Sequence, residues 1–239
     1  MLIPLPPSKI GGNDSFTKVL LHFDGTNAAT EMLDCAASGR TTAGSIRTWT
    51  ANGNAQIATA AKEFGVSALL LDGTGDYIDT ADSADFTAGS GDFTVDFWFN
   101  VQGGSGTVRY AFGQSDNAGT ATTNSLYAFL NTSNQFAARA VTGSSATTVT
   151  GTTAFSATGW HHFAFVRTGN TLKLFLDGTQ EGGDTAFTTT VNDSANKLSI
   201  GRLGELAGNE WNGYIDEFRL SIGTARWTAN FTPLTRAYS

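Results

Sequence analysis

Short stretches in which apolar and polar residues alternate recur along the whole chain. In the clearest of them, Asp92–Val101, phenylalanine or valine occupies every second position from Phe93 onward, and polar residues such as Thr94 and Asp96 fall between them. Successive side chains of a β-strand point to opposite faces of a sheet, so this alternation predicts a strand with one buried face.

Two further aromatic and β-branched runs, Trp160–Thr168 and Thr171–Asp177, are separated only by Gly169 and Asn170, which predicts a hairpin. Asp177–Gly178 is favoured in type I′ turns and predicts another strand near Gln180. The remaining expected strands are Thr17–Phe23, Ala68–Leu71, Tyr77–Thr80, Val108–Phe112, Ser125–Leu130, Gln135–Val141, Lys197–Gly201 and Asn212–Ser221. Helical turns are expected only near Ser83–Phe86 and Thr224–Asn230.

About a dozen strands without helical crossovers predict an all-β fold, a two-sheet antiparallel β-sandwich of the jelly-roll kind. Composition agrees, since the 239 residues include 35 Thr but only 5 Lys and 6 Glu, a balance that suits pleated sheets better than helix surfaces. Residues 1–14, with Pro4, Pro6 and Pro7, are expected to form a short extended N-terminal arm, and residues 15–239 one domain.

The charge and the apolar pattern exclude some classes of partner. A net charge of −7 and a pI near 4.8 disfavour nucleic acid. No apolar run approaches the ~18 residues that span a bilayer, and Met1–Gly12 lacks the features of a signal peptide. The single cysteine, Cys35, excludes an intrachain disulfide.

Six segments occur in an order typical of one family. They are Ser67–Asp79, Asp92–Phe99, Trp160–Arg167, Leu174–Gly178, Leu198–Arg202 and Gly213–Leu220. Together they resemble the laminin-G-like, concanavalin A-like jelly-roll domains, over about residues 16–220. The following segment, Gly223–Pro233, resembles the ending of such domains in bacteriophage virion proteins.

These resemblances imply a non-enzymatic bacteriophage virion protein, either a head decoration or fibre component or a part of the tail adhesion apparatus, that displays a lectin-like domain. We expect residues 1–13 to join other virion proteins and the domain to face host-surface glycans. The expected location is the virion, after synthesis in the host cytoplasm, and homo-oligomer formation is left open. The alternatives are a soluble carbohydrate-binding module and, third, a glycoside hydrolase.

Three aspartates are candidates for a structural calcium site. By strand parity Asp216 points toward the packed face of its sheet, and an isolated buried carboxylate must be protonated, hydrogen-bonded or bound to a cation. The family resemblance implies calcium at such an aspartate, completed here by Asp24 and Asp72. In the alternative interpretation Asp216 caps backbone amides, and Asp24 and Asp72 are turn residues before glycine.

No set of residues predicts catalysis. Asp216 and Glu217 are adjacent on a strand and face opposite ways, Asp92 and Asp96 have no glutamate beside them, and the pair Glu205 and Glu210 lies in a glycine-rich loop. His161 and His162 also face opposite sides of their strand, and the sequence identifies no partner that would orient either imidazole.

Aromatic residues in or near turn-rich regions are the candidates for ligand binding, because an exposed ring can stack on the apolar face of a sugar. These residues are Trp49, Tyr110, Tyr127, Trp211 and Trp227. The alternative for each of them is burial at the end of a sheet or between subunits.

Overall fold

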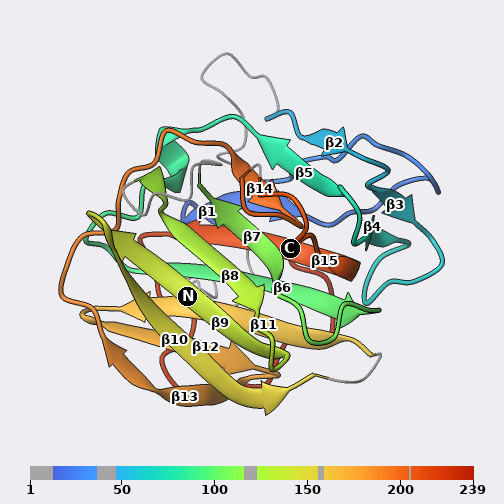
Figure 1. The fold of residues 1–239 in the computed structure, drawn as a ribbon. Coiled ribbons are helices and arrows are strands. Elements are labelled where there is room, and N and C mark those ends of the chain that lie inside the picture. The colour runs from blue at the N-terminus through green and yellow to red at the C-terminus, as the bar shows by residue number, and fades with distance from the viewer. Residues whose placement is uncertain (1–12, 37–46, 116–122, 156–158, 205) are drawn as a thin grey trace, which may run out of the picture.

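The computed structural model describes residues 13–36, 47–115, 123–155, 159–204 and 206–239, which form a sandwich of two antiparallel sheets (Figure 1). The sheet of eight strands has the order β13-β12-β11-β6-β15-β4-β3, with β1 paired to β15. Its strands are β1 (Thr17–Leu21), β3 (Gln56–Ala58), β4 (Ala68–Asp72), β6 (Phe93–Val101), β11 (His161–Thr168), β12 (Thr171–Leu176), β13 (Thr179–Ala186) and β15 (Asn212–Ile222).

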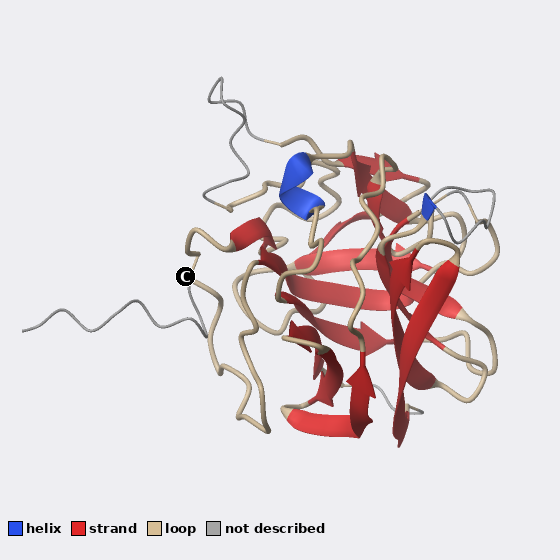
Figure 2. Ribbon diagram, turned by 90° about the vertical axis from the view of Figure 1, so that its left-hand side faces the viewer, coloured by secondary structure: helices blue, strands red, loops and turns tan. Residues whose placement is uncertain are grey.

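The sheet of seven strands faces the viewer in Figure 1 and has the order β10-β9-β8-β7-β14-β5-β2. Its strands are β2 (Thr50–Asn52), β5 (Tyr77–Thr80), β7 (Arg109–Gln114), β8 (Leu126–Leu130), β9 (Gln135–Thr142), β10 (Ser145–Ala154) and β14 (Leu198–Ile200). The two sheets lie face to face, and the described helical structure is limited to short turns such as the 3-10 turn η2 (Ala84–Phe86) (Figure 2).

The predicted all-β sandwich is therefore confirmed, as are the strands expected from the alternating pattern. The turn at Asp177–Gly178 has φ of 47° and 77°, the two positive values that a type I′ turn requires. The expected helical turn at 224–230 is wrong, because this segment runs over the outside of the eight-stranded sheet without helical structure. The expected arm, residues 1–14, lies outside the described residues except for Asn13 and Asp14, and stays a prediction.

Phenylalanines from both sheets meet in the core. The ring of Phe97 on β6 contacts Phe163 and Phe218 of its own sheet, with ring centroids 4.8 and 5.9 Å apart. It also contacts Phe112 and Phe136 of the opposite sheet, at 6.2 and 6.3 Å. Large aromatic side chains bury more apolar area than any others, so this cluster is a major part of what holds the two sheets together.

The C-terminal segment, residues 224–239, covers the outer face of the eight-stranded sheet. Trp227 and Phe231 stack on each other, with centroids 4.1 Å apart, and pack with Phe175 of β12. The backbone oxygen of Phe231 lies so close to Gly178 that a Cβ there would be only 1.9 Å away, so glycine is required for contact as well as for its positive φ. This face of the sandwich is thereby closed.

Beneath this segment lies a buried ion pair. Arg219 of β15 donates from Nε and Nη2 to the two carboxylate oxygens of Asp96 on β6, at 3.0 and 2.9 Å, and neither side chain is exposed. Tyr238 covers the guanidinium, whose Cζ lies 3.9 Å from the ring centroid, and the Tyr238 hydroxyl is 3.0 Å from Nε2 of His162. The pair thus joins two central strands to the end of the chain.

At one edge of the sandwich, Glu181 of β13 connects the two sheets. Its carboxylate accepts hydrogen bonds from the backbone N–H and the hydroxyl of both Thr152 and Thr153 on β10, at 2.6 to 2.9 Å. Burial alone would raise the pKa of Glu181, but these bonds outweigh it and lower the pKa.

A loop at the opposite side is held by two carboxylates. Asp216 accepts hydrogen bonds from the backbone N–H groups of Glu63, Phe64 and Glu217, and Asp24 accepts one from Val66. Burial and the charge of Glu217 raise the pKa of Asp216 to about 7, although the bonds from the backbone oppose this shift.

Among the described residues, no helix has the length and apolar character needed to cross a membrane.

Replacement of Glu181 by alanine is expected to lower the free energy of unfolding by about 2 kcal/mol, because four donors of β10 lose their acceptor. Urea denaturation at pH 7 measures the change. Asp184→Ala on the same strand is the control, because Asp184 is exposed and pairs with Lys173 and Gln180 of its own sheet, so it does not bridge the two sheets. Equal stability of the two variants would contradict a bridging role for Glu181.

The stability of the protein is expected to fall as pH rises from 4.5 to 6, in part because of Asp216. The pKa of Asp216 is 3.8 in an unfolded chain and about 7 in the folded protein, so over this interval only the folded state binds the extra proton. The folded state therefore loses stability relative to the unfolded state as pH rises. Asp216→Asn removes this titration, so its stability is expected to depend less steeply on pH than that of the wild type. Urea denaturation across the interval measures both slopes, and parallel curves would contradict the assignment.

Candidate functional site

The outer face of the seven-stranded sheet is the face that the C-terminal segment leaves open. The strand register places one residue from each strand side by side across this sheet. From β2 to β10 the row is Thr50, Asp79, Ser199, Gly113, Tyr127, Arg139 and Thr148. Tyr127 and Arg139 alternate along their strands with core residues such as Ala128 and Ala138, so the row belongs to the outer side.

Three aromatic rings gather on this outer face. Tyr110 of β7 lies beside Phe129 and Tyr127 of β8, with ring centroids 5.4 and 6.2 Å apart. Tyr127 and Phe129 are 5% and 7% exposed, whereas Tyr110 is only half-buried. Burial, together with the neighbouring Tyr127, raises the pKa of the Tyr110 hydroxyl, which therefore stays neutral and able to donate a hydrogen bond.

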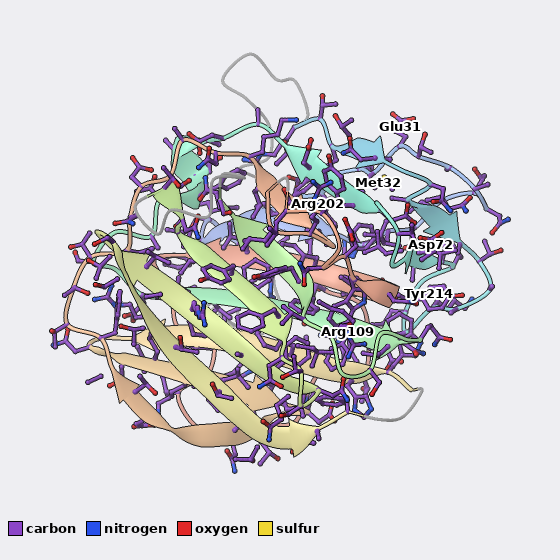
Figure 3. All side chains as sticks on the ribbon, in the orientation of Figure 1. Glu31, Met32, Asp72, Arg109, Arg202 and Tyr214 are labelled. Carbon is purple, nitrogen blue, oxygen red and sulfur yellow. The ribbon has the colours of Figure 1, made fainter. Side chains whose placement is uncertain are left out.

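Leu203, from the segment after β14, covers part of this cluster. Its side chain lies flat on the sheet over Gly113, where a Cβ would be 2.2 Å from Leu203 Cδ1 and 2.8 Å from Tyr127 Cβ. Glycine at this position therefore lets Leu203 reach the Tyr127 ring. Figure 3 shows the neighbouring Arg202 above β14 on the same face, with its guanidinium 4.6 Å from the ring of Tyr77.

Arg139 of β9 lies over the rings. Its Cζ is 5.1 Å from the centroid of Phe129 and 5.6 Å from that of Tyr127. Nε donates to Thr148 Oγ1 at 3.0 Å, and Nη1 donates to the Tyr127 hydroxyl at 2.9 Å. The guanidinium is thus held in one orientation on a surface of aromatic carbon.

Tyr110 and Tyr127 are therefore the predicted aromatic residues that the structure brings together. Trp49, Trp211 and Trp227 do not join them, since they are only 4%, 0% and 5% exposed. Trp211 packs in the core against Phe99 and Phe136, and Trp227 lies beneath the C-terminal segment. For these three tryptophans the expectation of an exposed ring is wrong, because nearby loops and the second sheet bury them.

Sequence reasoning missed Phe129, Arg139 and Leu203. A signal for Phe129 is present in the sequence, because Leu126–Leu130 is apolar at every position instead of alternating. When both faces of a strand are apolar, either both faces are buried or the outer face exposes an apolar surface that can bind a partner. Arg139 gave no signal, because its partners come from other strands.

The three aspartates of the expected calcium site do not form one ligand set. Asp24 and Asp216 hold the same loop, but Asp72 lies at the other end of β4, where it accepts hydrogen bonds from Thr74 and Asn54 (Figure 3). The donors around Asp216 are N–H groups, which cannot ligate a cation. Among the described residues no group of three or more acidic, histidine or cysteine side chains could hold a metal. The geometry fits the alternative, with Asp216 capping backbone amides.

The acidic residues considered for catalysis have structural partners. Asp96 is paired with Arg219, Asp92 accepts the N–H of Gly169, and Glu210 accepts the N–H of Gly208. Glu205 lies outside the described residues.

His161 has the orienting partner that the sequence did not identify, since its Nδ1 is 2.7 Å from a carboxylate oxygen of Asp177. His162 faces the outer side, near Trp98 and Trp227, while His161 lies against core rings. The expectation that they face opposite sides is confirmed.

Solved structures similar to this chain include binding domains of toxins and a domain of an arabinanase. The binding domain of Paraclostridial mosquitocidal protein 1 aligns with a TM-score of 0.66 and 13% identity, covering 88% of this chain and 50% of that one. The binding domain of botulinum neurotoxin DC in complex with SialylT gives 0.65 and 12%, covering 90% and 50%. The chain thus spans about half the length of these toxin domains.

Domain 4 of AbnA, a GH43 extracellular arabinanase from Geobacillus stearothermophilus, in complex with arabinotriose, aligns with a TM-score of 0.60 and 16% identity. That alignment covers 87% of this chain and 93% of the domain. At such low identity these likenesses show the fold alone. No curated protein sequence matches the chain.

Residues 72–224 match the family Laminin_G_3, described as the concanavalin A-like lectin/glucanases superfamily. This match covers more than half of the 239 residues and includes strands of both sheets. The chain therefore belongs to the Laminin_G_3 family of concanavalin A-like lectin/glucanase domains.

Proposed function

We propose that the protein is a non-enzymatic glycan-binding protein that binds saccharides on the outer face of its seven-stranded sheet. The observation that carries the proposal is the cluster of Tyr110, Tyr127, Phe129 and Arg139 on the sheet face that the C-terminal segment does not cover. We name this cluster the aromatic–arginine face.

The chemistry of this face suits a sugar. A pyranose presents axial C–H groups that pack on an aromatic ring, and the half-exposed ring of Tyr110 offers such a surface. Hydroxyl and guanidinium groups farther along the same face, from Thr148 and Arg139, can exchange hydrogen bonds with sugar hydroxyls. The sheet holds these groups on a rigid support, so little entropy is lost on binding.

The similar structures support the same function. The arabinanase domain was solved with arabinotriose and the neurotoxin domain with SialylT, and the toxin domains are described as binding domains. The structural partners of Asp92, Asp96 and Glu210 support a binding protein over a glycoside hydrolase.

We further propose that this domain belongs to a bacteriophage virion protein and that its N-terminal arm attaches it to the particle. The resemblance of Gly223–Pro233 to virion proteins supports the context. The position of Asn13 supports the arrangement, because its backbone N–H donates to Ser239 and its side chain to Cys35, beside Tyr238. Asn13 thus lies beside the C-terminal end of the chain (C in Figure 2), which packs on the eight-stranded sheet.

Tyr110→Ala is expected to weaken glycan binding about 2- to 10-fold, the loss that follows from removing one aromatic contact of about 0.5–1.5 kcal/mol. A glycan array identifies the ligand, and titration calorimetry then measures Kd for wild type and variant. Tyr214→Ala is the matched control, because Tyr214 lies on β15 of the other sheet, beside Trp160. Equal affinity of the two variants for the ligand would show that the site lies elsewhere. If the wild type binds no glycan, the proposal is wrong.

Removal of residues 1–12 is expected to leave a folded sandwich that no longer joins the particle. Asn13 is retained because its hydrogen bonds to Cys35 and Ser239 belong to the domain. Circular dichroism and thermal melting check the fold, and purified particles assembled with the shortened protein are probed for its presence. Normal incorporation of the shortened protein would contradict the role of the arm.

A further inference from the structure

Arg139 differs from the other well-anchored arginines of the described chain in what it binds. Arg47, Arg219 and Arg226 each donate to one or more carboxylates, which neutralise their charge. Arg109 and Arg167 donate only to uncharged oxygens, but they are 3% and 1% exposed and so are closed to a ligand. Arg139, by contrast, is half-buried, and no acidic side chain of the described residues lies within 4.0 Å of its guanidinium.

Some N–H groups of the Arg139 guanidinium have no acceptor among the described residues. An arginine has five N–H groups, of which Arg139 uses one on Nε for Thr148 and one on Nη1 for Tyr127. No described residue accepts a hydrogen bond from the other three, one on Nη1 and two on Nη2. Both N–H groups of Nη2 are among these three, so this end of the planar guanidinium is open to an acceptor.

The surroundings fix this group before a ligand arrives. Thr148 and the Tyr127 hydroxyl hold two corners of the guanidinium, and the rings of Tyr127 and Phe129 lie beneath it. A flexible surface arginine would lose rotamer freedom on binding, whereas Arg139 has already lost it. Such an arrangement is suited to a planar anion with two oxygens, and a carboxylate is that anion.

We propose that the aromatic–arginine face binds acidic glycans, with the carboxylate of a uronic or sialic acid residue held by Arg139. This inference rests on the proposed glycan-binding function and specifies its ligand class. Tyr110 is on β7 and Arg139 on β9, two strand spacings or about 10 Å apart, so a ligand that reaches both is an oligosaccharide. A neighbouring sugar residue stacks on Tyr110 while the acidic residue is bound at Arg139.

The negative net charge of the protein restricts the places where an acidic glycan can bind. The net charge is −7, so an acidic glycan is repelled by most of the surface, and its binding depends on a local cation. Lys197, which also lies at this sheet, is paired with Asp79 at 3.0 Å. In the row that crosses the sheet, Asp79 and Arg139 are the two charged residues, and three other strands separate them.

The test compares acidic and neutral glycans on the intact protein and on three variants. The probes are an array of carboxylated, sulfated and neutral oligosaccharides, followed by calorimetry with trigalacturonate and its methyl ester, and with sialyllactose and lactose. Trigalacturonate and its methyl ester differ only in their free carboxylates, whereas lactose lacks the whole sialic acid residue of sialyllactose. We expect wild type to favour a carboxylated probe at least 10-fold over its neutral counterpart, and this preference to shrink at higher ionic strength.

Arg139→Gln is expected to remove the preference, weakening the acidic probe at least 10-fold while leaving the neutral probe within about twofold. Arg139→Lys restores part of the affinity, since it keeps the charge but loses the planar guanidinium and its fixed donors. Arg236→Gln, at an exposed position of the C-terminal segment, is the charge-matched control and keeps the wild-type preference. Thermal melting of each variant shows whether the fold is intact.

Equal binding of acidic and neutral probes, or a preference for sulfated ones, would overturn the assignment of a carboxylate to Arg139. If acidic and neutral glycans bind equally and Tyr110→Ala weakens both, the glycan-binding function stands and only this inference fails. If no probe binds the wild type, both fail together.

Discussion

The ion pair between Asp96 and Arg219 is the interaction on which the arrangement of the two sheet faces depends. Both side chains are fully buried, and removing two charges from water costs several kcal/mol per ion unless the geometry compensates. Here two parallel hydrogen bonds, and the Tyr238 ring over the guanidinium, provide that compensation. Burial alone would raise the pKa of Asp96, but Arg219 holds it well below its usual range, so the pair stays charged across the physiological interval.

This pair needs the C-terminal segment, because without it the charges would sit on an open sheet face. The same segment brings Trp227 and Phe231 over Phe175, so the outer face of the eight-stranded sheet is covered by residues of the chain itself. The described residues provide no such continuous cover for the outer face of the seven-stranded sheet. Leu203 covers only its centre, over Gly113. The difference between a structural face and a binding face thus follows from where the end of the chain packs.

The strands with strict alternation, such as Phe93–Val101, could be predicted from sequence because one of their faces is buried by the opposite sheet. The strand β10 was missed, because Ser145–Ala154 is an edge strand with few apolar residues, and Thr and Ser are equally frequent in loops. A helical turn was expected at residues 224–230. The segment is instead irregular, because in this form Trp227 packs against the outer face of the eight-stranded sheet.

Only part of the candidate site could be predicted from the sequence, because the rest depends on contacts between distant segments. Tyr110 and Tyr127 lie on strands whose boundaries the sequence indicates, so their place in a sheet follows from periodicity. The burial of Trp49, Trp211 and Trp227 depends on which loops fold over them, and no local pattern encodes that. The orientation of Arg139 depends on hydrogen bonds to Thr148 on the next strand and Tyr127 on the previous strand, so it could not be predicted from the residues near Arg139 in the sequence.

The stability of the folded protein accounts for only some of the residues in the aromatic–arginine face. Tyr127 and Phe129 are almost fully covered, so their burial contributes to folding like that of other core residues. On β10 of the same sheet, however, the outward positions are Thr148 and Thr150, which pair with Arg139 and Ala137 and satisfy the strand without aromatic rings. The half-exposed Tyr110 and the open donors of Arg139 gain little from folding, because water already solvates the parts that face it. Groups that are held rigidly and yet left incompletely satisfied are what a binding surface requires, since the ligand then supplies the contacts that the fold does not.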